Sequence, residues 1–357
     1  MASEQSPAKG GHFGGKYKPE WLNLVKEAAL DPELPIIDPH THLYDDPVRR
    51  ANLGGFMTEE FLEEIRASGH NVVSTVHCEA YGTFLDENAP KELQAVAETR
   101  VAARVGEEAL ALDPQGPRLS EGIICNADLT LGDRLDEVIA AHREAARGRL
   151  RGVRAMTMSD PDIQLPYSVA VDNMAAPEFI AGAKRLVGHN LAWDAAACHP
   201  QIPQVAALAE RVPELPIVLN HVGMPIYIAR FADKFQETYR HWLAMMTDLA
   251  RYPNVHVKVS GIFMTFSGLS FEGKPTPPTS QQAADNMRDH YLPTIDLFGP
   301  ERCMFASNFP RDRLGISYGV LWNAHKILAE RYTPKERDAL FHGTAAKVYQ
   351  LGSPLAA

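Results

Sequence analysis

The chain has 357 residues, and its 45% hydrophobic and 8% aromatic content is that of a globular protein with a large core. Its net charge of −10 disfavours non-specific binding to nucleic acid or to an anionic membrane, but it says little about the substrate, because one local arginine can still bind an anion. We expect a small-molecule substrate as the partner, with a homo-oligomer also allowed. Four cysteines are too few for a disulfide scaffold, so we expect free buried thiols in a cytoplasmic protein.

Residues 1–16 are rich in glycine and serine, which predicts a flexible N-terminal arm. No run of apolar residues approaches membrane-spanning length. No internal repeat or second domain is visible, so we expect residues 17–357 to form one domain.

Beyond the arm, short apolar runs alternate with longer segments that have the apolar spacing of helices, such as residues 58–69 and 135–146. The runs lack the strict alternation of half-exposed strands, which favours a sheet buried on both faces. Eight strands alternating with helices predict a distorted TIM-type (β/α)8 barrel. An open doubly wound sheet is the alternative, but no G-x-G-x-x-G motif follows the first strand. The predicted strands are residues 35–43, 71–80, 121–129, 150–157, 191–199, 216–223, 255–262 and 303–310.

A long segment, residues 263–281, follows the seventh predicted strand. In a barrel this segment would lie over the mouth at the carboxyl ends of the strands, where long loops often act as lids. Its apolar residues, among them Phe266, favour a substrate-contacting loop over an inert surface excursion.

Polar residues gather where the predicted strands end. His40 and His42 lie two apart on the first strand, so both imidazoles face the same side and can form a pair of metal ligands or a solvated strand end. In a barrel the later strand ends meet at the same mouth. They carry His77 and Glu79, Arg154, Asp194 and His199, Asn220 and His221, Lys258 and Ser260, and Ser307 and Asn308.

Four motifs in this order resemble the amidohydrolase superfamily of the amidohydrolase-2 type: "DPHTH" at 38–42, "CHPQ" at 198–201, "LNHVG" at 219–223 and "ASNFP" at 306–310. The likeness is greatest to its lactonase-like branch, which includes fuconolactonase and pyrone-dicarboxylate lactonase. It runs over nearly the whole chain and implies the barrel fold.

The resemblance implies that His40, His42 and His199 hold one divalent metal, zinc first and manganese second. It also implies that His221 polarises the substrate carbonyl or shuttles a proton. Members of the superfamily use an aspartate on strand eight as the general base, but this chain has Asn308 there. An amide is not basic, although it can bind a water or coordinate a metal weakly. A metal-free mechanism, which the resemblance attributes to some lactonases of the branch, therefore stays open.

Another group has to activate water if the chain is a hydrolase. Glu79 is the first candidate, with a salt bridge to Arg154 or Lys258 as its alternative role. His221 is the second candidate. Asp312 is the third, and it can equally cap a helix.

The remaining polar residues have two possible roles each. Arg154 can grip a substrate carboxylate or carbonyl, or pair with an acid at the mouth. His77 is a structural hydrogen-bonding group or a substrate contact. Lys258 fits a buried structural ion pair, and Asp194 can orient His199 or be a buried structural acid.

Three functions compete. The first is a hydrolase that opens a lactone or related cyclic ester, bearing a carboxylate or hydroxyl group, with an activated water. The second is a metal-dependent decarboxylase of an unsaturated or aromatic acid on the same barrel, and the third is a non-catalytic binding barrel. The lactonase-like motifs at strands five, six and eight favour the hydrolase.

Overall fold

The computed structural model describes residues 15–80, 83–155, 157–161 and 173–352. Within them, eight parallel strands form one sheet in sequential order, and each strand pairs with the next along the chain. All eight predicted strands and the TIM-type barrel are confirmed. The strands are β1 (Ile36–Thr41), β2 (Val72–Cys78), β3 (Arg118–Cys125), β4 (Leu150–Val153), β5 (Ala192–Ala195), β6 (Ile217–Leu219), β7 (Val255–Val259) and β8 (Cys303–Phe305).

The barrel closes between β8 and β1 just beyond the regular strands. Thr41 forms a parallel bridge with Phe309, and the His42 amide donates to the Phe309 carbonyl at 2.7 Å. The Asn308 amide donates to the His40 carbonyl at 3.0 Å. The backbone of the two histidines is therefore part of the closure itself.

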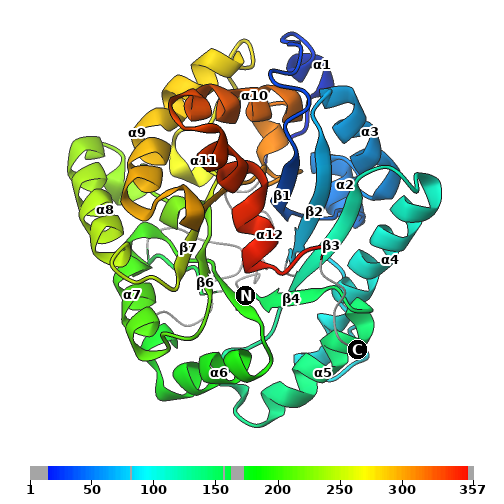
Figure 1. Ribbon diagram of the computed structural model, residues 1–357, viewed down its shortest axis with the longest axis vertical. Coiled ribbons are helices and arrows are strands. Elements are labelled where there is room, and N and C mark those ends of the chain that lie inside the picture. The colour runs from blue at the N-terminus through cyan, green and yellow to red at the C-terminus, as the bar shows by residue number, and fades with distance from the viewer. Residues whose placement is uncertain (1–14, 81–82, 156, 162–172, 353–357) are drawn as a thin grey trace, which may run out of the picture.

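Helices surround the strands, and Figure 1 shows them as an outer ring. None of the described helices is long and apolar enough to cross a membrane. Residues 1–14 of the predicted arm lie outside the described part of the chain. The helices are α1 (Pro19–Leu22), α2 (Pro47–Leu53), α3 (Thr58–Ser68), α4 (Val96–Leu112), α5 (Arg134–Ala146), α6 (Pro177–Gly188), α7 (Ile202–Arg211), α8 (Phe235–Leu249), α9 (Ser280–Phe298), α10 (Tyr318–Leu328), α11 (Pro334–Asp338) and α12 (Thr344–Val348).

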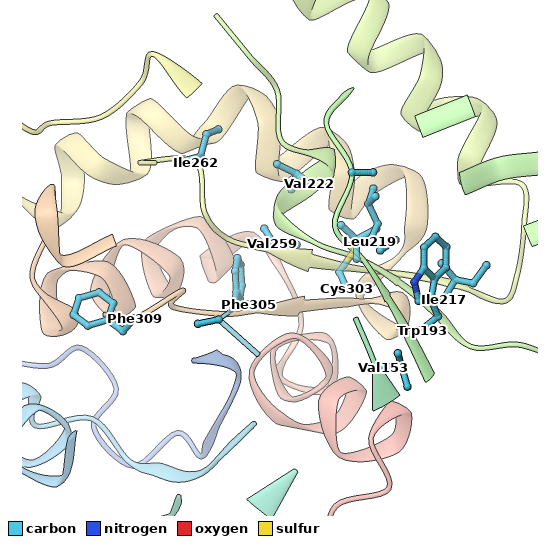
Figure 2. Close-up of a cluster of buried hydrophobic side chains, with 14 of the residues drawn as sticks. Val153, Trp193, Ile217, Leu219, Val222, Val259, Ile262, Cys303, Phe305 and Phe309 are labelled. Carbon is cyan, nitrogen blue, oxygen red and sulfur yellow. The ribbon is translucent and has the colours of Figure 1, made fainter. Parts of the chain in front are cut away.

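The core has two layers. The outer layer packs strands against helices; Figure 2 shows its part near β4 to β8, with Trp193 on β5 and Phe305 on β8. The inner layer fills the barrel, and α12 lies across its centre in Figure 1. There Val348 and Tyr349 pack with Ile37 and with other interior side chains of the strands, so this helix closes the floor. The four cysteines are free and buried, as expected.

The strands end earlier than the apolar runs suggested, so several predicted strand residues lie in the connecting loops. His221 and Asn308 have left-handed backbone conformations, with φ of 55° and 57°, which cannot continue a strand. The loop between β7 and α9 buries Phe263 against Phe271, with ring centroids 5.3 Å apart. The prediction for the Phe266 side chain lies outside the description.

Candidate active site at the barrel mouth

Three imidazoles meet at the mouth. The ring centroids of His40 and His42 are 4.9 Å apart, and that of His221 is 4.4 Å from His40. The pairing of β1 with β2 is irregular between Asp38 and Thr41, where β1 approaches the mouth. Burial lowers the pKa of all three imidazoles well below the usual value, so they are neutral at pH 7.

Arg154 extends from the end of β4 to Glu79 at the end of β2. Its Nε donates to Glu79 Oε1 at 2.6 Å, and its Nη2 donates to the Glu79 carbonyl oxygen. Both side chains are buried. Glu79 is therefore ion-paired with Arg154 and orients the guanidinium so that Nη1 lies 3.4 Å from His40 Nε2.

Lys258 on β7 reaches the other nitrogen of His40. Its Nζ lies 3.3 Å from His40 Nδ1 and 2.5 Å from Asp194 Oδ1, and the Lys258 and Asp194 side chains are fully buried. Asp194 also accepts from Asn220 Nδ2 at 2.9 Å and from the Tyr349 hydroxyl at 2.9 Å. The predicted ion pair of Lys258 thus exists, but its ammonium also contacts a histidine of the mouth.

His42 is held on both sides. Its Nδ1 lies 2.8 Å from the Cys78 carbonyl oxygen, and its Nε2 lies 3.3 Å from Asn308 Oδ1. Asn308 Nδ2 donates to Asp312 Oδ1 at 2.7 Å. Burial raises the pKa of Asp312 to about 7, although the hydrogen bond from Asn308 opposes that shift. His42 is therefore linked through the Asn308 amide to the Asp312 carboxyl group.

His221 is fixed from behind by Ser260, whose Oγ lies 2.9 Å from His221 Nδ1. Gly261, with φ of 70°, leaves room for this ring, because a Cβ atom there would lie 2.4 Å from His221 Nδ1. A glycine is required here both by its backbone conformation and by the close approach.

Two predicted site residues make their own contacts outside this group. The His199 ring packs against Phe231, with centroids 4.9 Å apart, and its Nδ1 accepts from the Ile226 amide at 3.3 Å. His77 faces Glu98 of α4, with Nε2 and Oε1 3.3 Å apart. His199 as a metal ligand and His77 as a substrate contact therefore stay predictions that this arrangement does not support.

Sequence reasoning missed two supporting residues. Asp38 is buried and accepts from the Ser307 amide at 3.0 Å and from the Tyr318 hydroxyl at 2.9 Å, which ties β1 to the turn that carries Asn308. Tyr349, beyond α12, holds Asp194 from the floor. The acidic residue within "DPHTH" was a visible signal for the first, whereas nothing marked Tyr349.

The mouth residues do not fit a metal held by His40 and His42. Within residues 15–80, 83–155, 157–161 and 173–352, the one group of three potential ligands within 4.8 Å of one another is His40, Cys78 and Asp194. Lys258 neutralises Asp194, and burial raises the pKa of the Cys78 thiol to about 11. Both nitrogens of His40 face a cationic side chain. A divalent ion at His40 would therefore meet repulsion from Arg154 and Lys258.

A sequence model of the amidohydrolase family matches residues 37–351. The chain belongs to the amidohydrolase family. This amidohydrolase is an enzyme of that superfamily, and its place in the lactonase-like branch agrees with its similarity to curated relatives. One is L-fucono-1,5-lactonase of Burkholderia multivorans, which is 27% identical over 332 residues, covering 89% of this chain and 97% of the relative.

Solved structures share the barrel. A zinc-bound amidohydrolase from Burkholderia multivorans superposes with a TM-score of 0.66 at 21% identity, covering 88% of this chain and 99% of the other. A 5-carboxyvanillate decarboxylase from Sphingomonas paucimobilis superposes with a TM-score of 0.53 at 14% identity, covering 89% and 99%. At these identities the likeness concerns the fold, which serves both hydrolysis and decarboxylation.

Proposed function

We propose that this amidohydrolase opens a lactone or related cyclic ester by attack of water on the ring carbonyl. The observation that carries the proposal is the meeting of three neutral imidazoles with the Arg154 guanidinium at one mouth. Neutral imidazoles can accept a proton from water, and a buried guanidinium stabilises the negative charge that develops on the carbonyl oxygen. The lactonase name of the curated relative supports the same reaction.

Each mouth residue has a proposed role. Arg154 binds the carbonyl oxygen, and Glu79 orients Arg154 instead of acting as the base. A histidine takes the proton of the attacking water, with His42 and His221 as the two candidates. Asn308, held by Asp312, orients that water. The loop carrying Phe266 is proposed to border the substrate, as expected from the sequence.

We further propose that the reaction runs without a metal, because the cations at His40 oppose one. The competing proposal is zinc held by His40, His42 and His199, which requires Arg154 and Lys258 to leave His40 and the His199 ring to turn inward. Elemental mass spectrometry on untagged protein purified without chelators separates the two. Substoichiometric zinc with activity unaffected by chelators supports the metal-free site, and stoichiometric zinc lost in His40→Gln overturns it.

A panel of lactones in weakly buffered solution with a pH indicator tests the reaction, because ring opening releases a proton. We expect Arg154→Met to lower kcat/KM by about 10²–10³-fold, the loss seen when one donor to an oxyanion is removed. Arg151→Met is the matched control: Arg151 lies on β4, just before Arg154, and among the described residues its Nη1 donates to the carbonyls of Gly148 and Leu150.

The outcomes are distinct. Acidification with lactones that is lost in Arg154→Met and kept in Arg151→Met supports the proposal. Release of CO₂ from unsaturated or aromatic acids without lactone opening would replace it with the decarboxylase. Ligand-dependent thermal stabilisation with neither reaction would make the protein a binding barrel.

A further inference from the structure

A small apolar cluster, separate from the two layers of the core, lies at the mouth. Its buried members all follow the carboxyl ends of four neighbouring strands, β4 to β7, and the ends of barrel strands share one mouth. Half of them are methionines. We call this group the methionine cluster; its members are Met158, Ala196, Cys198, Met224, Ile226 and Met264.

Two backbone hydrogen bonds join the methionine cluster to the surroundings of His221. The Met224 amide donates to the His221 carbonyl at 2.8 Å, and the Met264 amide donates to the Gly261 carbonyl at 3.3 Å. Gly261 itself lies against the His221 ring, because a Cβ atom there would be 2.4 Å from Nδ1. The cluster therefore borders the imidazole of His221 on the side of β6 and β7.

The polar side chains of the mouth have little contact with solvent. The exposed fraction is 0% for His40, 6% for His42 and for Arg154, and 4% for His221. A substrate ring that reaches these groups has to move some of the side chains around them. Methionine is suited to such movement, because it is unbranched and has three rotatable bonds. A substituent that takes the place of methionine contacts would lie in an apolar environment with little water.

An arginine beside the cluster is already paired with an acid. The Arg230 guanidinium lies 4.4 Å from the centroid of the Phe231 ring, which packs against the cluster. Its two terminal nitrogens donate to the two carboxylate oxygens of Asp160, each at 2.6 Å. Arg154 and Lys258 are likewise paired with buried acids. A substrate carboxylate would have to compete with one of these pairs and lose its own hydration.

We propose that the methionine cluster receives an uncharged hydrocarbon substituent of the substrate, so that the ring opened at this mouth carries an alkyl or aryl group. The ring itself rests on the proposed ester hydrolysis, whereas the preference for an apolar substituent can be measured by binding alone. The proposal departs from the carboxylate- or hydroxyl-bearing ring expected from the sequence.

A series of γ-butyrolactones, each a single enantiomer, tests the substituent on the carbon bonded to the ring oxygen. From methyl to butyl we expect kcat/KM to rise about fourfold with each methylene, which corresponds to about 0.8 kcal/mol for each buried CH₂ group. The carboxylate and hydroxymethyl lactones should react more slowly than the methyl lactone, because burial leaves their polar groups without water. A flat alkyl series, or faster opening of either polar lactone than of the propyl lactone, would overturn the proposal.

Met264→Gln places an amide of similar length in the cluster. We expect it to reduce kcat/KM for the butyl lactone more than for the methyl lactone, so that the increase with chain length flattens. The matched control is Met245→Gln, on α8, where Met245 is half-buried and packs against the outer layer. The control should keep the wild-type increase.

A purely structural role for Met264 predicts a different result, an equal loss for every lactone, and that result would overturn the assignment of the cluster. Should Met264→Gln fail to fold, the lactone series with the wild-type protein still decides whether the mouth prefers an apolar substituent.

Binding separates the apolar preference from the reaction. 2-Alkylcyclopentanones keep the ring carbonyl but have no ester bond to hydrolyse, and isothermal titration calorimetry measures their affinity. We expect Kd to fall about fourfold with each methylene, with a negative heat-capacity change from buried apolar surface. Such tightening without opening of any lactone would refute the proposed hydrolysis and support the apolar site. Lactone opening with no dependence on chain length in either series would refute the apolar site and keep the hydrolysis.

Discussion

Gly261 shows how one residue can determine the position of an imidazole in the site, that of His221. Its φ of 70° and the His221 ring together leave no room for a side chain. Gly261→Ala should push the imidazole aside, and a displacement of about 1 Å can cost about 10²-fold in rate. Steady-state kinetics on a lactone substrate would measure the loss.

The same loop supplies a control for backbone strain. Gly273 has a φ of 79°, and a Cβ atom there would meet nothing within 4 Å. Gly273→Ala should therefore lose about 1–2 kcal/mol of stability from the left-handed conformation without losing activity. Equal activity losses in the two variants would mean that strain in the loop, and not contact with His221, is responsible.

At the residue scale, the sequence was a better guide to which side chains lie at the mouth than to which groups those side chains contact. The strand-end rule located His40, His42 and Arg154 because parallel strands in a barrel end together. The contacts of Lys258 and His199 depend on side-chain direction and on the path of a loop, which local patterns do not encode. Nothing in the residue pattern indicated that Lys258 would face His40.

At the scale of elements, the barrel seam depends on one buried carboxylate. Asp38 on β1 accepts from the Tyr318 hydroxyl at the start of α10 and from the Ser307 amide beyond β8. Tyr318→Phe removes a hydrogen bond to a buried acid, so we expect it to lower the free energy of unfolding by about 1.5–3 kcal/mol. Urea unfolding followed by circular dichroism would measure this.

The matched control is Tyr332→Phe. The Tyr332 hydroxyl lies 3.3 Å from Asp296 Oδ1 on the exposed surface, where loss of a hydrogen bond changes stability by about 0.5 kcal/mol or less. If both variants lose the same stability, the seam does not depend on the bond to Asp38.

The elements themselves were predicted well because each strand is a buried apolar run separated by a helical segment. The positions at which the strands end were not predicted well. The apolar runs continue through "LNHVG" and "ASNFP", but the left-handed residues His221 and Asn308 interrupt the strands. Those backbone conformations are stabilised by tertiary contacts, which a run of apolar residues does not reveal.

At the scale of the whole molecule, stability should fall in acid. Outside the site, burial lowers the pKa of five histidines to about 4 or, for His325, about 3. The unfolded chain binds protons at these sites below the usual pKa of 6.5 and the folded chain does not, so stability present above pH 6.5 is lost as the pH falls toward 4. The four histidines whose pKa falls to about 4 are His70, His142, His256 and His290.

Two aspartates act in the opposite direction. Burial raises the pKa of Asp38 to about 6 and of Asp312 to about 7, so the folded chain gains stability as these acids protonate. Five histidines should outweigh them, and denaturant unfolding from pH 6.5 to 4 should show a net decline. His325→Phe, which keeps the stacking with Phe305, should make the decline shallower; an unchanged slope would mean that His325 does not contribute.

The floor of the barrel has a consequence for biosynthesis. On the ribosome, all eight strands have been made before Tyr349 is added, because β8 ends at Phe305. A nascent chain that stops short of α12 would expose Ile37, Val76 and the other apolar side chains of the inner layer, and Asp194 would lack its bond from Tyr349. The amidohydrolase should therefore acquire its finished site only after α12 and Tyr349 have been made, and until then the open floor is a surface on which chaperones can act.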